Sequence, residues 1–215
     1  MTQDLKVHFG CGHYKLKGWI NVDLDPSCKP DLIADLRQCL PFRPRTIDYI
    51  HSEDFIEHME LGHVFGFFRE CHRILKEGGV MRVLTPDLYQ LARRYLKGDK
   101  KLLELWKKQV GVPLRTGSLC ELFNLGMRLG GHTFLFDGAL LVTVLKECGF
   151  ELKKVRYNWS EEAPLCGLDI RSPQTALSMY YDCYKGERPK ARWEWFRQIL
   201  KMISFRTIDL FGLGK

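Results

Sequence analysis

Glycines and carboxylates follow three short apolar runs near the start of the chain, and this placement suits nucleotide binding. Gly10 and Gly12 come directly after the first run, where the missing Cβ atoms let the backbone approach a ligand closely. Asp23 ends the second run, where a carboxylate can accept both hydroxyls of a ribose. Asp35 follows the third run, where a carboxylate can accept the exocyclic amine of adenine. These residue types therefore indicate a site for an adenosine-containing ligand.

The elements that must position these residues alternate between strand and helix patterns. Apolar runs of strand length occupy residues 5–9, 19–23, 31–34, 47–51, 80–84, 150–157 and 175–183. Helical patterns occupy residues 61–75, 87–96, 100–110 and 138–148; Asp137 is the N-cap of the last, and Lys76-Glu77-Gly78-Gly79 stops the first. This alternation predicts a doubly wound, mostly parallel, three-layered α/β fold with an antiparallel edge. Ligands bind such sheets at the carboxyl ends of the strands.

The motifs, taken in their order, resemble a known family. Residues 5–157 contain HFGCG, GWINVD, ADL, IDYIHSEDFIEHM, FFRECHRILKEGGVMRVLTPDL and ECGF. This series is similar to the Rossmann-like class I S-adenosylmethionine-dependent methyltransferases, in particular to the small type-11-like branch associated with polysaccharide synthesis. The resemblance implies S-adenosyl-L-methionine as the cofactor. A nicotinamide-binding Rossmann protein is the rival reading, but Lys15 stands where its third glycine should be.

The resemblance also implies which residues hold the cofactor. They are Phe9, Gly10, Cys11, Gly12, Asp23, Leu24, Asp35, Leu36, His51 and Ser52. The glycine loop would lie against the methionine part, and the first aspartate would hold the ribose. The pair at 35–36 would flank the adenine, and the pair at 51–52 would line the floor beneath the sulfonium.

Methyl transfer to a hydroxyl requires a base, and three residues are candidates for it: His132, Asp87 and Asp54. We favour His132, because the ordinary pKa of an imidazole lies near neutral pH; alternatively, it anchors its own loop. Asp87 alternatively caps the helix that follows Pro86, and Asp54 alternatively sits on the solvated surface. The pair Glu57-His58 is interpreted as a structural hydrogen-bonding element.

Residues 1–185 form the predicted methyltransferase domain, and residues 98–131 form a helical insertion within it. The insertion contains Trp106 and Arg115, and it is expected to be a lid over the active site or a small subdomain packed on the core. Residues 186–215 have the pattern of a basic amphipathic helix. Such a helix suits peripheral membrane contact, or packing on its own domain or on a partner subunit.

Composition excludes several classes of protein. The chain has 215 residues, of which 45% are hydrophobic and 27% charged, and no apolar run is long enough to cross a membrane. No secretory signal is apparent, so the expected location is cytoplasmic. The net charge is +7, but residues 184–215 account for +5 of it, which argues against a nucleic-acid partner. The eight cysteines are scattered, and no metal site is expected.

The sequence therefore predicts an O-methyltransferase that acts on a sugar hydroxyl of a polysaccharide or glycolipid precursor, with a glycosyltransferase as a partner. One alternative is methylation of a small molecule or of a protein side chain. Another is a non-catalytic, methyltransferase-like scaffold.

Overall fold

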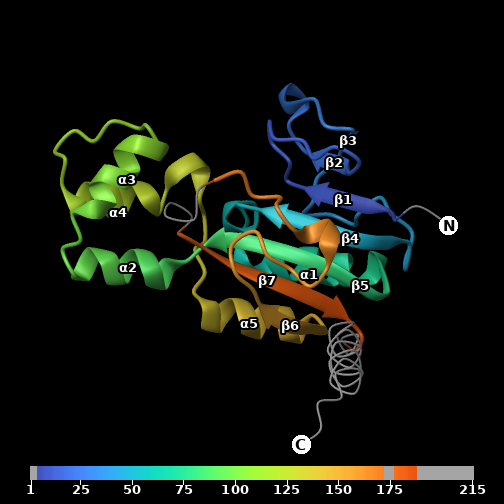
Figure 1. Cartoon of the computed structure of the whole chain (residues 1–215). Helices are drawn as coiled ribbons and strands as arrows, with labels where there is room; N and C mark the ends of the chain where they lie inside the picture. The colour runs from blue at the N-terminus through green and yellow to red at the C-terminus, as the bar shows by residue number, and fades with distance from the viewer. Residues whose placement is uncertain (1–3, 172–176, 188–215) are drawn as a thin grey trace, which may run out of the picture.

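A seven-stranded mixed sheet forms the centre of the protein, as a computed structural model shows (Figure 1). The structure describes residues 4–171 and 177–187. The strands are β1 (Lys6–Phe9), β2 (Ile20–Asp23), β3 (Leu32–Ile33), β4 (Ile47–Glu53), β5 (Leu75–Pro86), β6 (Phe150–Lys154) and β7 (Ser178–Lys185). Their order is β3-β2-β1-β4-β5-β7-β6, and β7 is antiparallel to both of its neighbours. The predicted parallel sheet with an antiparallel edge is confirmed.

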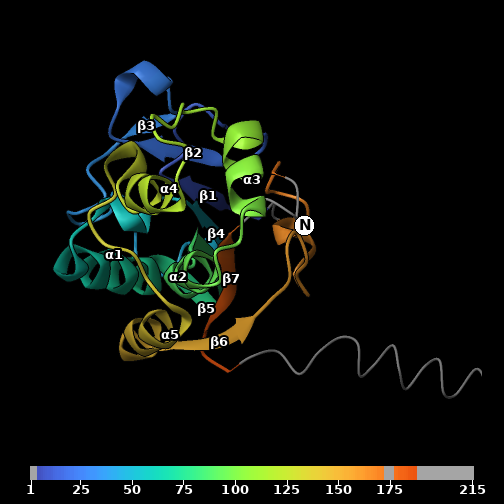
Figure 2. The ribbon, with the colours of Figure 1, turned by 90° about the vertical axis from the view of Figure 1, so that its left-hand side faces the viewer.

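One face of the sheet is covered by two helices, α1 (Leu61–Ile74) and α5 (Gly138–Glu147) (Figure 2). Apolar side chains from both helices join those of the sheet in the main core, among them Phe67, Phe68 and Leu141. The predicted N-cap of α5 is confirmed, since the Asp137 carboxylate accepts a hydrogen bond from Leu140 N at 2.8 Å. Helical apolar spacing therefore locates both helices from the sequence.

The start of β5 differs from the prediction. The helix α1 ends at Ile74, one residue before its predicted end, but β5 begins at once with Leu75 instead of at residue 80. Leu75 is fully buried, has an extended backbone and pairs with Ile47 on β4. A register shift between Ile47 and Tyr49 accommodates the extra residues of β5. Pairing with β4 thus draws residues 75–79, including the two glycines, into the strand.

The second face of the sheet corrects the expectation of three layers. Within the described residues no α-helix covers it; the loop 13–18 and the segment 155–171 pack there instead (Figure 2). The connections at 10–19 and 24–31 are too short for a crossover helix, which normally takes a dozen residues or more. The doubly wound prediction is therefore wrong for this face.

A row of polar side chains crosses the second face, because strand register aligns them. Asn21, His8, His51, Arg82 and Asp182 are partners on neighbouring strands, and all five are buried. Burial lowers the pKa of both histidines to about 3, so both imidazoles are neutral. Their rings lie 5.1 Å apart.

The row ends in a buried ion pair that also binds the covering segment. Arg82 Nε and Asp182 Oδ1 are 2.6 Å apart, and their side chains are 2% and 0% exposed. Ser160 Oγ donates to Asp182 Oδ2 at 2.7 Å, and Arg82 donates to the carbonyl of Trp159 at 2.9 Å. Every charge is thus matched, which is what allows burial of the pair.

Beyond the carboxyl end of β5, three helices stand together at one end of the molecule (Figure 1). They are α2 (Leu88–Leu96), α3 (Lys101–Gln109) and α4 (Leu119–Gly126). A separate apolar cluster that includes Leu91, Trp106 and Leu122 holds them together. The insertion predicted at 98–131 is therefore helical. The amphipathic helix predicted for 186–215 lies, from residue 188 on, outside the described residues.

The buried ion pair yields a stability prediction. Asp182→Asn keeps the shape of the side chain but leaves Arg82 buried without its counter-charge, so the free energy of unfolding should fall by about 3–5 kcal/mol. Arg45→Gln is the control, because the ion pair of Arg45 with Glu77 is exposed on both sides, and it should change stability by about 1 kcal/mol or less. Urea unfolding measures both; equal changes in the two variants would contradict the prediction.

Candidate active site

A cleft of about 380 Å³ opens at the carboxyl ends of β1 to β4. Six of the residues predicted from the sequence line it: Gly10, Gly12, Asp23, Leu24, Asp35 and Leu36. Arg37, Asp54, Phe55, His58 and Met59 complete the lining. The structure therefore brings the ends of four strands together around one space, as the topology of a parallel sheet requires.

The glycine loop fits tightly against a phenylalanine. Gly10 N donates to Val22 O at 2.9 Å, and Gly10 has a φ of +66°, which favours glycine. A Cβ atom at Gly10 would lie 2.4 Å from Cδ2 of Phe55. Gly12 also has a positive φ, but a Cβ there would meet nothing within 4 Å. Of the two glycines, Gly10 is thus fixed by packing as well as by conformation.

Two carboxylates of the cleft are held in different ways. Asp23 accepts hydrogen bonds from Gly12 N at 2.8 Å and from Asp25 N at 3.0 Å, one on each oxygen. Each of its oxygens keeps a lone pair for a ligand hydroxyl. Asp35 instead forms a two-pronged contact with Arg37 at 2.8 and 3.0 Å, which lowers its pKa to about 2. Sequence reasoning missed Arg37 as a partner of this carboxylate.

Four predicted cofactor residues do not line the cleft with their side chains. Phe9 lies in the core under α1, and the Cys11 thiol is buried, which raises its pKa to about 11. His51 belongs to the polar row of the second face, and Ser52 is fully buried within β4. Alternation along the strands turns these side chains into the sheet layers. The expected floor formed by residues 51 and 52 is therefore not seen as a side-chain contact.

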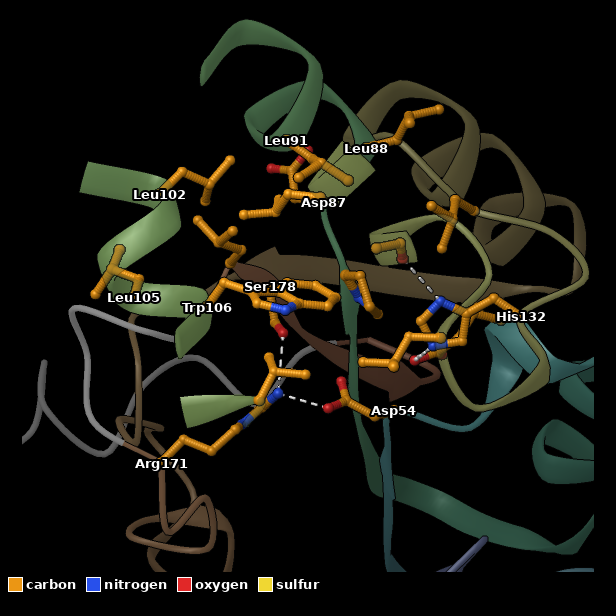
Figure 3. A pocket seen from close by; sticks show the side chains of 18 residues that line it. Asp54, Asp87, Leu88, Leu91, Leu102, Leu105, Trp106, His132, Arg171 and Ser178 are labelled. Carbon is orange, nitrogen blue, oxygen red and sulfur yellow. Dashed lines mark hydrogen bonds and ion pairs between the residues drawn. The ribbon is translucent and has the colours of Figure 1, made fainter. Parts of the chain in front are cut away.

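A larger cavity of about 670 Å³ lies between the sheet and the helices α2, α3 and α4 (Figure 3). Its walls are mostly apolar and include Leu91, Leu102, Leu105, Trp106 and Leu122. The insertion thus packs as a small helical unit that also forms a wall of this cavity, and its role as a lid stays a prediction.

The polar end of this cavity lies where the two cavities meet. Asp54 lines both of them, and Arg171 donates to Asp54 Oδ2 at 2.5 Å. Figure 3 shows Arg171 and Asp54 joined below Trp106, with His132 farther to the right. Burial raises the pKa of Asp54 to about 6 and that of Glu57 to about 8. A cluster of acids with raised pKa therefore stands at the junction.

Glu57 and His132 approach each other at this end. Glu57 Oε2 accepts from the Thr85 hydroxyl at 2.9 Å, and Glu57 Oε1 lies 3.9 Å from His132 Nε2. His132 Nδ1 donates to Gly126 O at 3.2 Å, because a carbonyl can only accept. Burial and the neighbouring His58 lower the pKa of His132, which favours the neutral ring. The lone pair of His132 thus faces Glu57.

Asp87 has the structural role that was its alternative. Its carboxylate accepts from Gln90 N at 3.2 Å and so caps α2. It also lines the larger cavity. Asp54 is not the freely solvated side chain of its alternative, because Arg171 holds it.

Solved structures of S-adenosylmethionine-dependent methyltransferases share the fold of this chain. A methyltransferase from Archaeoglobus fulgidus described as SAM dependent shares 14% identity over 85% of this chain and 86% of its own, with a TM-score of 0.51. An S-adenosylmethionine-dependent methyltransferase from Mesorhizobium loti shares 14% over 84% and 90%, with a TM-score of 0.51. At 14% sequence identity, these two structural similarities show the fold alone. No curated protein sequence matches the chain.

Residues 20–83, from the start of β2 into β5, match the family model described as "Methyltransferase domain". This segment is thus similar to a methyltransferase domain, and the fold of the whole chain is that of S-adenosylmethionine-dependent methyltransferases. None of the described helices is long and apolar enough to span a bilayer.

Sequence reasoning missed two features of the site. Arg171 is 117 positions from Asp54, and no local pattern marks it. The structural interpretation of Glu57-His58 agrees with the hydrogen bonds that Glu57 accepts from Thr85, Thr133 and Phe134. It did not include the places of Glu57 in the wall of the larger cavity and of His58 in the wall of the cleft.

The fit of Gly10 against Phe55 gives a prediction. Gly10→Ala should weaken S-adenosylmethionine binding by at least about tenfold, or 1.4 kcal/mol, because the new methyl group must displace the Phe55 ring in the cleft. Gly18→Ala is the matched control: φ is +78°, and the added Cβ meets nothing within 4 Å. Calorimetric titration of both variants measures the effect. Equal affinities would show that this contact does not shape the cleft.

Proposed function

We propose that the enzyme transfers the methyl group to a hydroxyl oxygen, on a sugar of a glycolipid or polysaccharide precursor. The observation that carries this proposal is the junction at Asp54, which lines both the cleft and the larger cavity. A methyl donor in one space and an acceptor in the other would meet there. Proximity of this kind accounts for a large part of the rate in group transfer.

The cleft suits the cofactor by the chemistry of its donors. We expect Asp23 to bind the ribose hydroxyls through its free lone pairs, and Asp35 with Leu36 to flank the adenine. Bound S-adenosylmethionine supplies a methyl group on a positively charged sulfonium. The carboxylates that line the cleft favour a cationic ligand over an anionic one, because opposite charges attract in a partly desolvated space.

The polar end of the larger cavity suits a hydroxyl acceptor. An alcohol must lose its proton as the new bond forms, so a base must be within reach. Asp54, Glu57 and His132 stand together there. The raised pKa values of Asp54 and Glu57, about 6 and about 8, lie near neutral pH, and the lowered pKa of His132 favours a neutral ring that can accept a proton. We assign proton removal to this cluster, and within it Asp54 and His132 are our candidates, as the sequence indicates. Asp87 serves as the helix cap.

The apolar walls favour an acceptor with an apolar body. A free polysaccharide would leave the leucines and Trp106 in contact with polar groups, whereas a lipid-linked sugar would bury its chain among them. This supports the glycolipid over the polysaccharide. A small apolar hydroxyl compound is the second candidate, because the same walls fit it. A non-catalytic scaffold is disfavoured, since it would not need a carboxylate such as Asp23 in the cleft.

Binding of the cofactor tests the first half of the proposal. Wild-type protein should bind S-adenosylmethionine with micromolar affinity, and Asp23→Ala should abolish binding, because the variant removes the ribose partner. Glu104→Ala, an exposed acid on α3, should bind like wild type. Isothermal titration calorimetry measures all three. No binding by the wild type would overturn the proposal.

Acceptor preference tests the second half. Each buried methylene contributes about 0.8 kcal/mol, so an octyl glycoside should be methylated with a KM at least about 100-fold lower than its methyl counterpart. Trp106→Ala should reduce this preference, since the ring forms part of the wall. Product formation from a radiolabelled methyl donor measures the rates. Equal KM values for the two glycosides would contradict the lipid-linked acceptor.

The C-terminal segment 186–215 extends the proposal to location and partners. Its basic amphipathic pattern would hold the enzyme at an anionic membrane surface, close to lipid-linked acceptors and to a glycosyltransferase. Deletion of residues 188–215 should abolish binding to anionic liposomes and leave thermal unfolding unchanged. Absence of liposome binding by the full chain would exclude this role.

A further inference from the structure

The geometry points to a divalent metal site at the junction of the two cavities, formed by Glu57, His58 and His132 with Asp54 beside them. We call these four residues the junction cluster. The site lies where the proposed function places the acceptor hydroxyl, but the binding of a metal ion does not depend on that function.

The spacing of the possible ligand atoms fits one shared ion. One atom from each of Glu57, His58 and His132 can be chosen so that all three lie within 4.8 Å of one another. Glu57 Oε1 and His132 Nε2 are 3.9 Å apart, which is too long for a hydrogen bond. Two ligand atoms about 2.1 Å from the same ion are separated by about 3–4 Å. The gap between these atoms therefore has the width that a cation fills.

Two buried carboxylate oxygens point independently to a cation. Glu57 is fully buried, and its Oε1 accepts no hydrogen bond from the described residues. The same holds for Oδ1 of Asp54, whose other oxygen binds Arg171. Leaving such an atom unpaired costs about 1–3 kcal/mol, and more for a charged group. A cation at the junction would satisfy both oxygens.

The surrounding contacts orient the ligands as outer contacts do in known metal sites. Ligating histidines commonly donate their other ring N–H to a carbonyl, and His132 Nδ1 donates to Gly126 O at 3.2 Å. The Thr85 hydroxyl holds Glu57 Oε2 at 2.9 Å and leaves Oε1 facing His132. The rings of His58 and His132 are 4.9 Å apart at an angle of 71°. Neither ring therefore has to turn far to reach a common ion.

The donor set narrows the class of metal. Two imidazoles with one or two carboxylates suit borderline divalent ions such as Mn²⁺, Fe²⁺ and Zn²⁺ better than Ca²⁺. Such an ion would lower the pKa of an acceptor hydroxyl that coordinates it. His132 would then be a ligand that positions the metal, and Asp54 would remain near the acceptor. The earlier expectation of no metal rested on spacing along the chain, whereas residues 57 and 132 meet only in space.

Metal titration without cofactor or acceptor tests the site. Protein stripped with a chelator is titrated separately with Mn²⁺, Zn²⁺ and Mg²⁺ by calorimetry, and Mn²⁺ binding is followed in parallel by electron paramagnetic resonance. Wild type should bind one Mn²⁺ or Zn²⁺ per chain, more tightly than Mg²⁺. His58→Ala and His132→Ala should each weaken binding at least about tenfold, because each removes a ligand. Glu57→Gln, which keeps the shape of the side chain, should weaken it as well.

His63→Ala is the matched control, since His63 is exposed on α1 outside the junction cluster. Its affinity for the metal should equal that of wild type, and circular dichroism should show every variant folded. Absence of binding of all three ions to wild type would overturn the site. Binding that survives in both His58→Ala and His132→Ala would place the metal elsewhere and overturn it too. Cofactor titration of the stripped protein separates this failure from a failure of the proposed function.

Discussion

The burial of the Glu57 carboxyl group ties together the parts of the molecule that form the active site. Its side chain binds Thr85 at the end of β5, and its own carbonyl accepts the backbone N–H groups of Thr133 and Phe134. The loop that carries His132 is thereby fixed to the segment that follows β4. Displacing Glu57 would break its contacts with Thr85 and with the loop at 133–134 at the same time. These contacts offset the energetic cost of burying its carboxyl group where the two cavities meet.

The segment 54–58 forms the partition between the two cavities. Phe55 and His58 face the cleft, Glu57 faces the larger cavity, and Asp54 borders both. Phe55 packs tightly against Gly10 and also against Phe67 of α1, and these contacts fix the position of the segment relative to the glycine loop. A short segment with a 3₁₀ turn at Ile56–His58 thus positions groups for a donor and for an acceptor together.

Local patterns in the sequence predicted the elements, and topology alone predicted the cleft. Gly10, Asp23 and Asp35 end successive parallel strands, so they had to gather at one edge of the sheet. Prediction failed where the outcome depends on distant partners. The start of β5 depends on the pairing of Leu75 with Ile47, and the missing helical layer depends on what packs over the polar row. The contact of Arg171 with Asp54 depends on the path of the segment 155–171, and the pairing of Glu57 with His132 depends on how the insertion returns to the sheet. Periodicity encodes neither of these paths.

The polar row on the second face has a consequence for motion. The segment 155–171 that covers it is held to the sheet by side-chain contacts such as those of Ser160 with Asp182 and of Asp169 with Tyr180. Irregular segments of this kind open at lower free energy than helices or central strands. Because Arg171 lies at the end of this segment and lines the larger cavity, a local opening would release Asp54 while the sheet stays intact. Such an opening would also widen the entry to the larger cavity.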